Sequence, residues 1–322
     1  MNQKIVVLER DSVGRDVEID RYRDFGEVVV YDNTVTEEEV AERVKDATII
    51  IGNKSPMNER SLKEATKVQM ITGFATGYDN IDISYLNSRN IVFSNVQDYA
   101  TAAVAQHTFA LALYVMEHLH HYDHYVKDGA YEAQSRFSNF DVAFHDLEGK
   151  TWGIAGMGHI GRKVAQIATA FGCNVITYST SGKAAKGDYP QVDFETLCRQ
   201  SDVISLHCPL TDRTRHLINE KAFDLMKESA VLVNVARGPV VDSKALYDAL
   251  VQGKILGAGL DVLEKEPIRP EDPLHQFKDS SRLVITPHLA WASIEARERC
   301  AQQVYENIDG FLKGTPVRQI VG

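Results

Sequence analysis

The chain is poor in cysteine, and none of its cysteines is spaced to hold a metal. Its four cysteines among 322 residues are Cys173, Cys198, Cys208 and Cys300, without the paired spacing of zinc sites. We expect free thiols, which are typical of a reducing compartment. The start, MNQKIVVLERD, has too short an apolar run for a signal peptide. A cytoplasmic location is therefore expected.

Long apolar runs and an excess of positive charge are also missing. No stretch approaches the roughly 20 apolar residues that span a membrane. Lys and Arg number 35 against 45 Asp and Glu, which gives a net charge of −10. Nucleic acids and anionic membranes attract proteins with a positive field, so neither is expected as a partner. An anionic substrate would have to be held by local cations.

What the chain does have is the make-up of an ordinary globular protein, with 44% hydrophobic and 25% charged residues, and a length that suits about two domains. Short β-branched runs alternate with helix-like runs in residues 1–93 and again after residue 150. Strands separated by helices indicate parallel sheets covered on both faces. We predict an α/β protein of two doubly wound domains. The expected strands are Ile5–Leu8, Val28–Tyr31, Thr48–Ile51, Val68–Thr72, Ile91–Phe93, Trp152–Ala155, Asn174–Tyr178, Val203–Leu206, Ala230–Asn234, Ile255–Asp261 and Leu283–Ile285.

Helices are predicted between these strands, at Thr36–Asp46 with a capping box of Thr36 and Glu39, and at Asn58–Ala65, Phe194–Arg199, Glu220–Met226, Ser243–Gln252 and Glu295–Leu312. One long helix is expected over residues 101–127, followed by an extended arm over 131–147. The long helix is apolar on more than one side, so it must be buried between domains or between subunits.

The stretch TWGIAGMGHIG at residues 151–161 predicts a dinucleotide-binding turn. Gly156, Gly158 and Gly161 form a G-x-G-x-x-G between a strand and a helix. The first glycine permits the tight turn, the second lets the backbone approach a pyrophosphate, and the third lets helix and strand pack closely. Free N–H groups at the helix start would attract the phosphates. The alternative is a glycine-rich turn without a ligand.

The second strand of such a fold usually ends in an acid that binds the adenosine ribose. Here the strand at 174–178 runs into Ser179, Thr180, Ser181, Gly182 and Lys183, with no carboxylate. These hydroxyls and Lys183 could bond a 2′-phosphate. We therefore predict that NADP(H) is tolerated or preferred. If the segment is only a polar turn, NAD serves as the cofactor.

Three successive strands each end in an ionisable group. Arg237 lies in NVARGPVV, the acids Asp261, Glu264 and Glu266 lie in GLDVLEKEP, and His288 lies in TPH. The carboxyl ends of parallel strands meet at one edge of a sheet, where ligands bind. A carboxylate beside a histidine raises the imidazolium pKa and orients the ring. The set is suited to hydride transfer onto a ketone, in which a proton must reach the oxygen.

A histidine group on the long helix invites a metal interpretation, because His120 and His124 are four residues apart. His118 and His121 lie beside them, but no third ligand is evident. No functional metal is expected, and the group is interpreted as surface or interface histidines.

Taken together, the motifs resemble the D-isomer specific 2-hydroxyacid dehydrogenase family over nearly the whole chain. They are GYDNID at 77–82, VAQHTFAL at 104–111, GMGHIG at 156–161, HCPLT at 207–211, NVARGPVVD at 234–242, GLDVLEKEP at 259–267 and PHLAW at 287–291. The resemblance implies a flavodoxin-like substrate-binding domain of residues 1–99 plus 290–322, a Rossmann NAD(P)-binding domain of residues 100–289, and a cleft between them. It also implies a homodimer, with the long helix and the arm as the interface.

The resemblance implies roles for single residues as well. Arg237 would anchor the substrate, Glu266 would pair with His288, and His288 would donate and accept the proton. Thr76, Gly77, Tyr78 and Trp291 would contact the substrate together with Arg237 and His288. The cofactor contacts would be Gly156, Gly158, His159, Ile160, Gly161, Ser179, Thr180, Ser181, Lys183, His207, Cys208, Pro209, Ala236 and Asp261, the last near the nicotinamide carboxamide.

Within the family, Trp291, the NVQDYAT turn and the STSGK stretch resemble the glycerate dehydrogenase or hydroxypyruvate reductase branch. The expected activity is reversible reduction of a short 2-keto acid, of hydroxypyruvate or glyoxylate type, to the D-2-hydroxy acid. Alternatives are a reductase for bulkier keto acids, a phosphoglycerate-type dehydrogenase, and a non-enzymatic NAD(H)-sensing module like the related corepressors. Trp291 could equally serve in hinge packing.

Overall fold

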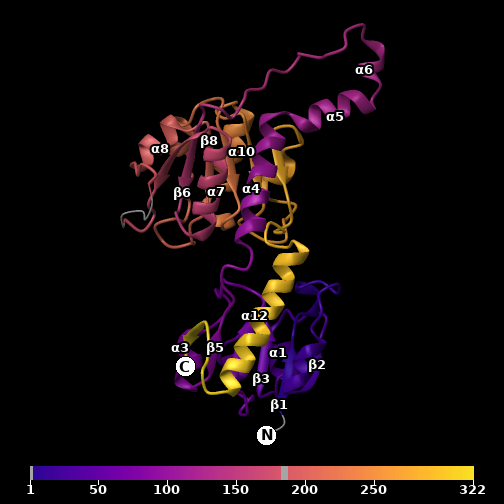
Figure 1. Cartoon of the computed structure of the whole chain (residues 1–322), viewed down its shortest axis with the longest axis vertical. Coiled ribbons are helices and arrows are strands. Elements are labelled where there is room, and N and C mark those ends of the chain that lie inside the picture. The colour runs from indigo at the N-terminus through magenta and orange to yellow at the C-terminus, as the bar shows by residue number, and fades with distance from the viewer. Residues whose placement is uncertain (1–2, 183–187) are drawn as a thin grey trace. The chain divides into compact units, whose positions relative to one another are not determined.

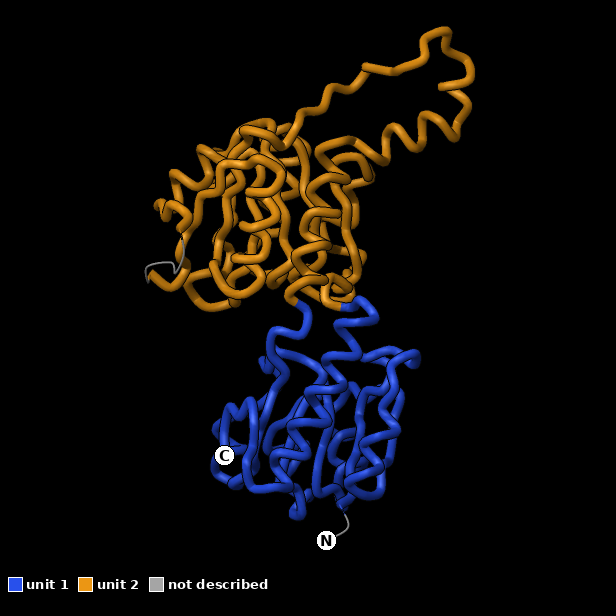
Figure 2. Tube along the Cα trace, viewed as in Figure 1, with its two compact units in different colours: residues 1–100, 292–322 blue, residues 101–291 orange. Residues whose placement is uncertain are grey.

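The computed structural model describes residues 3–182 and 188–322, which form two compact units (Figure 2). Unit 1 comprises residues 1–100 and 292–322, and unit 2 comprises residues 101–291. Each contains a six-stranded sheet, and helices lie between the strands in chain order (Figure 1). The prediction of two doubly wound α/β domains is confirmed. All four cysteines are free, as expected, and all four are buried.

The sheet of unit 1 has the strand order β12-β5-β4-β3-β1-β2. Five strands are parallel, and β12 pairs antiparallel with β5 at the edge. This last strand was not predicted, since its three residues fold back from beyond the final helix. The strands are β1 Gln3–Val7, β2 Gly26–Val30, β3 Ile49–Gly52, β4 Met70–Gly73, β5 Val92–Ser94 and β12 Gln319–Val321.

Helices cover both faces of this sheet. On one face Val40, Leu62 and Leu86 pack with the apolar side chains of the strands. The final helix lies on the other face, where Tyr22 Oη donates to the carbonyl of Ala301 at 3.0 Å. The predicted capping box of Thr36 and Glu39 is present. The elements are η1 Arg10–Ser12, η2 Asp20–Phe25, α1 Glu37–Arg43, α2 Glu59–Leu62, α3 Ile83–Ser88, which was not predicted, and α12 Ile294–Leu312.

The sheet of unit 2 is entirely parallel, in the order β11-β10-β9-β8-β6-β7. Since β7 lies on one side of β6 and β8 on the other, the chain reverses direction across the sheet at β6. Parallel sheets bind ligands at the carboxyl ends of the strands beside such a point. The strands are β6 Thr151–Ala155, β7 Asn174–Tyr178, β8 Val203–Leu206, β9 Val231–Asn234, β10 Gly257–Leu260 and β11 Leu283–Ile285.

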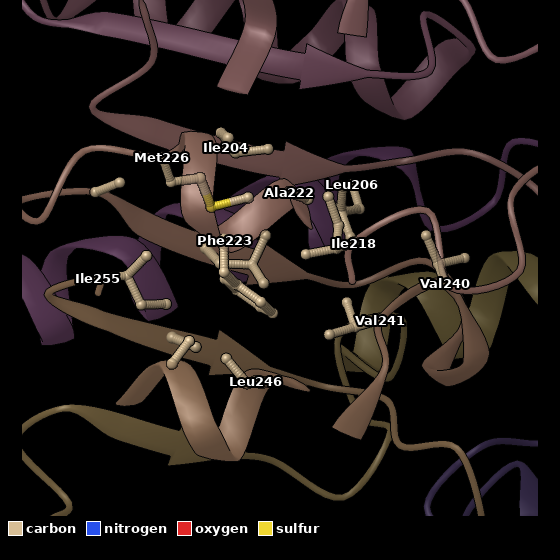
Figure 3. Packing of buried hydrophobic residues seen from close by; sticks show 14 of the residues in the cluster. Ile204, Leu206, Ile218, Ala222, Phe223, Met226, Val240, Val241, Leu246 and Ile255 are labelled. Atoms are coloured by element: carbon tan, nitrogen blue, oxygen red, sulfur yellow. The ribbon is translucent and has the colours of Figure 1, made fainter. Parts of the chain in front are cut away.

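Alternating side chains of these strands build two apolar layers. Trp152, Ile154 and Val233 pack on one face with residues of α4 and α7. Ile204 and Leu206 pack on the other face with Phe223 of α9 and Leu246 of α10 (Figure 3). The helices are α4 Thr101–Met116, α7 His159–Ala170, α8 Phe194–Gln200, α9 Glu220–Leu225, η3 Gly238–Val240, α10 Ser243–Val251 and α11 Pro273–Gln276.

The prediction of one continuous helix over 101–127 is wrong. The helix α4 ends at Met116, and His118 adopts a left-handed conformation with φ of +51°. A second helix, α5 Leu119–Lys127, then leads away from the body of unit 2 to the short α6 Ala130–Ala133 (Figure 1). No residue of α5 is buried, and its side chains contact the arm, where Tyr122 Oη donates to the carbonyl of Val142. Among the described residues, no helix is long and apolar enough to cross a membrane.

Candidate active site

The glycine turn follows β6, where the strand order reverses. Gly156 has φ of +100°, and a Cβ atom there would lie 2.8 Å from the amide nitrogen of Cys208. Gly161 lies against the carbonyl of Gly156, with no room for a side chain. In front of Gly158 the space is open, since an added Cβ would meet no atom within 4 Å. The turn therefore leaves room beside the first N–H groups of α7, which suits a phosphate.

His159 and Ile160 are the first residues of α7 after the cap at Gly158, and the start of a helix favours an anion because its dipole is positive there. The loop 207–209 packs on the turn, because His207 donates its N–H to the carbonyl of Ala155 at 2.9 Å. Burial lowers the pKa of His207 to about 3 and raises the pKa of Cys208 to about 11. Both side chains are thus neutral near pH 7, and Pro209 beside them is exposed.

A hollow of about 650 Å³ lies where β7 ends. Its lining includes Ser179, Thr180, Gly182 and Arg213. Arg213 makes no ion pair with any residue that the structure describes. Asp193 also lines the hollow, but its carboxylate accepts the N–H of Thr196 at 2.7 Å and caps α8.

The predicted ribose segment also includes Ser181 and Lys183. The hydroxyl of Ser181 lies 3.4 Å from that of Ser179, and Lys183 lies outside the described residues. Arg213 was not among the predicted cofactor contacts. The sequence did contain a usable signal. The stretch TDRTR at 211–215 overlaps the motif HCPLT in the loop after β8, and β8 ends at the same edge of the sheet as β7.

Arg237 lies just beyond β9 on a turn held by the buried side chain of Asn234. The amide nitrogen of Asn234 donates to the carbonyl of Arg237 at 3.0 Å, and its oxygen accepts the N–H of Ala236 at 3.0 Å. The guanidinium of Arg237 donates to the carbonyl of Ala236 at 2.9 Å. This places Ala236 and Arg237 at the carboxyl edge of the sheet, as predicted from the strand position.

The structure brings Glu266 and His288 into direct contact. His288 Nδ1 lies 2.7 Å from Glu266 Oε2, with the side chains 30% and 36% exposed. The other oxygen of Glu266 accepts the N–H of Leu263 at 3.0 Å. His288 has φ of +55°, a left-handed conformation that costs about 1–3 kcal/mol in a residue with a side chain and is common at functional sites.

Asp261 stabilises the conformation of the segment that carries His288. Its carboxyl group is 2% exposed, and its two oxygens accept the N–H groups of Leu289 at 2.9 Å and Ala290 at 2.8 Å. The hydroxyl of Thr286 also donates to it at 2.6 Å. His107, whose pKa is lowered by burial, lies 2.9 Å from that hydroxyl. The predicted contact of Asp261 with a nicotinamide stays a prediction.

The remaining predicted substrate residues are distributed over both units. In unit 2, Trp291 donates its indole N–H to the carbonyl of His288 at 3.0 Å. In unit 1, Thr76, Gly77 and Tyr78 follow β4. Thr76 donates its hydroxyl to the carbonyl of Val96 at 2.7 Å, and Tyr78 is 38% exposed. Among the described residues, no three His, Cys, Asp or Glu side chains are grouped to hold a metal ion.

Comparison with known proteins agrees with this arrangement. The family model described as "D-isomer specific 2-hydroxyacid dehydrogenase, NAD binding domain" matches residues 109–290. A hydroxypyruvate reductase of Blautia hydrogenotrophica is 35% identical over 322 residues, covering 98% of this chain and 99% of that protein. A glycerate dehydrogenase of Methylorubrum extorquens is 36% identical over 319 residues, covering 98% of each.

Solved structures agree over nearly the full length. The TT0316 protein from Thermus thermophilus is 32% identical with a TM-score of 0.89, covering 99% of this chain and 100% of that one. An acyclic imino acid reductase (Bsp5), solved in complex with NADPH and D-Arg, is 32% identical with a TM-score of 0.86 and the same coverage. The chain belongs to the D-isomer specific 2-hydroxyacid dehydrogenases, oxidoreductases that act on CH–OH donors with a nicotinamide cofactor.

Proposed function

We propose that the chain reversibly reduces a short 2-keto acid, of hydroxypyruvate or glyoxylate type, to the D-2-hydroxy acid. The observation that carries this proposal is the 2.7 Å contact of His288 Nδ1 with Glu266 Oε2, in the same unit as the glycine turn and Arg237. The relatives named hydroxypyruvate reductase and glycerate dehydrogenase support the choice of substrate.

The proposed roles follow from the chemistry of the side chains. Arg237 binds the substrate carboxylate with two parallel hydrogen bonds and polarises the carbonyl. Glu266 orients the ring of His288 through Nδ1, so that Nε2 can donate a proton to the carbonyl oxygen during reduction. A bound nicotinamide supplies the hydride to the carbonyl carbon. Thr76, Gly77, Tyr78 and Trp291 remain proposals for further substrate contacts.

We propose NADP(H) as the preferred cofactor. Gly156, Gly158 and Gly161 with the start of α7 would hold the pyrophosphate, because the space in front of Gly158 is open. The hollow after β7 offers two hydroxyls and the guanidinium of Arg213 to a 2′-phosphate. The Bsp5 reductase, solved with NADPH, supports this choice.

Steady-state turnover with both cofactors and a series of keto acids tests these proposals together. We expect kcat/KM to be higher with NADPH than with NADH, and higher with hydroxypyruvate and glyoxylate than with pyruvate or bulkier keto acids. A strong preference for NADH would contradict the cofactor proposal, and a preference for bulky keto acids would contradict the substrate proposal. Cofactor binding without turnover on any of them would favour a sensing module.

Arg213→Ala provides the matched variant for that experiment. Loss of a hydrogen bond to a charged group costs about 1.5–3 kcal/mol, so we expect kcat/KM for NADPH to fall about 10–100-fold with little change for NADH. Arg215→Ala, an exposed arginine of the same loop, is the control. Equal effects of Arg213→Ala on both cofactors would remove this residue from the phosphate site.

We propose a homodimer assembled through the arm. Phe137 is 90% exposed and Phe140 is 76% exposed, and exposed apolar segments of this kind mark interaction sites. Light scattering on the full chain is expected to give twice the 36.0 kDa chain mass. The double variant Phe137→Ser, Phe140→Ser should shift the measured mass toward that of the monomer. An unchanged mass would show that the arm is not the interface.

A further inference from the structure

Two loops at the carboxyl edge of the unit 2 sheet touch beside the Glu266–His288 pair. A Cβ atom added to Gly238, next to Arg237, would overlap the backbone of Leu263 and lie 2.5 Å from the amide nitrogen of Glu264. Leu263 in turn donates its N–H to Glu266 at 3.0 Å. The turn that carries Arg237 thus lies against the loop that carries Glu266.

Glu264 joins this contact to a helix. Its Oε1 atom accepts the N–H of Ser243 at 2.8 Å, and Ser243 is the first residue of α10. A carboxylate is favoured at this position because the N–H groups at a helix start lack partners and the helix dipole is positive there. The Glu266 loop is therefore attached to the segment that follows Arg237 by a side chain as well as by backbone contact.

His216 lies on the other side of the Glu264 carboxylate. Its Nε2 is 3.5 Å from Glu264 Oε2, and its Nδ1 is 3.9 Å from Asp242 Oδ2. Its backbone N–H donates to the carbonyl of Pro239 at 2.8 Å. The loop after β8 is thereby bonded to the Arg237 turn. The imidazole of His216 lies between Asp242, in the segment that follows Arg237, and Glu264, in the loop that carries Glu266.

The loops that make these polar contacts pack on a buried apolar cluster. Ile218, Val240, Val241 and Leu246 belong to one buried cluster under the same loops (Figure 3). Ile218 also exchanges backbone hydrogen bonds with the Arg237 segment, since its N–H donates to Val240 and its carbonyl accepts from Asp242. The segments at 216–218 and 238–242 therefore form one unit, to which Glu264 attaches the Glu266 loop.

We infer that Glu264 and His216 are positioning residues that set the distance between Arg237 and the Glu266–His288 pair. The inference rests on the proposed roles of Arg237, Glu266 and His288. These three come from different strand ends, so their mutual placement depends on contacts between loops. A displacement of about 1 Å at a reacting group can cost about 10²-fold in rate.

The first test compares Glu264→Ala with its conservative variant. We expect Glu264→Ala to lower kcat about 10²-fold, with an unchanged Kd for the cofactor and a larger solvent isotope effect, because the misplaced proton transfer becomes slower. Glu264→Gln keeps an acceptor for Ser243 and should restore most of the rate. Glu271→Ala, at an exposed glutamate of the same segment, is the matched control. A normal kcat for Glu264→Ala would overturn the inference.

The second test combines substitutions. If Glu264 acts through Glu266, adding Glu264→Ala to a Glu266→Gln enzyme should lower kcat by less than about a further threefold. The effects of substitutions at residues that act as a unit are not additive. A full additional loss would overturn the inference. If Glu266→Gln alone turns over normally, the proposed function fails instead. Should Glu264→Ala not fold, His216→Gln takes its place. Its kcat and its Kd for the cofactor are measured alone and in a Glu266→Gln enzyme, and the same outcomes support or overturn the inference.

Discussion

His288→Asn is expected to lower kcat about 10²–10⁴-fold, the usual effect of removing a general acid. Asparagine has a similar size but cannot exchange a proton near neutral pH, so the carbonyl oxygen would have to take its proton from water. The substitution leaves the glycine turn and the hollow after β7 untouched, and cofactor affinity should therefore stay the same. Fluorescence titration with NADPH, alongside steady-state turnover of hydroxypyruvate, measures both quantities.

The control for this experiment is His275→Asn, at an exposed histidine of the same unit. It should retain full activity. Near-normal turnover of His288→Asn would exclude His288 as the acid and would leave its contact with Glu266 as a structural one. A loss of cofactor binding would instead show that the substitution disturbs the segment held by Asp261.

Arg237→Ala should lower kcat/KM for the keto acid by at least about 10²-fold. Two hydrogen bonds to a carboxylate are lost, each contributing about 1.5–3 kcal/mol, and a tenfold change corresponds to about 1.4 kcal/mol. The KM for the cofactor should remain unchanged. Arg237→Lys should fall between wild type and alanine, because an ammonium cannot make the two parallel bonds of a guanidinium.

Arg269→Ala, at an exposed arginine in the segment after Glu266, is the matched control and should behave as wild type. An unchanged kcat/KM for Arg237→Ala would remove Arg237 from the substrate site. Equal loss with keto acids and with neutral ketones would also contradict the anchoring role, since only the acids present a carboxylate.

Local patterns were enough to predict most of the fold. Strands and helices show their period within a few residues, and the capping box at Thr36 is read from two positions. The break at His118 was missed because α4 and α5 are both helical by composition and only packing separates them. The strand β12 was missed because its partner, β5, is more than 200 residues away in the chain.

The candidate site was predictable in its residues more than in its contacts. Sequence reasoning named Glu266 and His288 as a pair, and their atoms lie 2.7 Å apart. It named Asp261 for the cofactor, whereas the described contacts of its carboxylate are with the segment around His288. Arg213 went unnoticed because its place in the hollow depends on where β7 and β8 end, on either side of β6.

By itself, the sequence determined the two doubly wound sheets, the glycine turn and the ionisable groups at three successive strand ends. Those features depend on local periodicity and on the residue type at single positions in the chain. The tertiary structure alone decided which loops touch: Gly238 against Leu263, Glu264 on the start of α10, and His216 between two carboxylates. A parallel sheet gathers loops that lie far apart in the chain at one edge, and their contacts have no local signature in the residues.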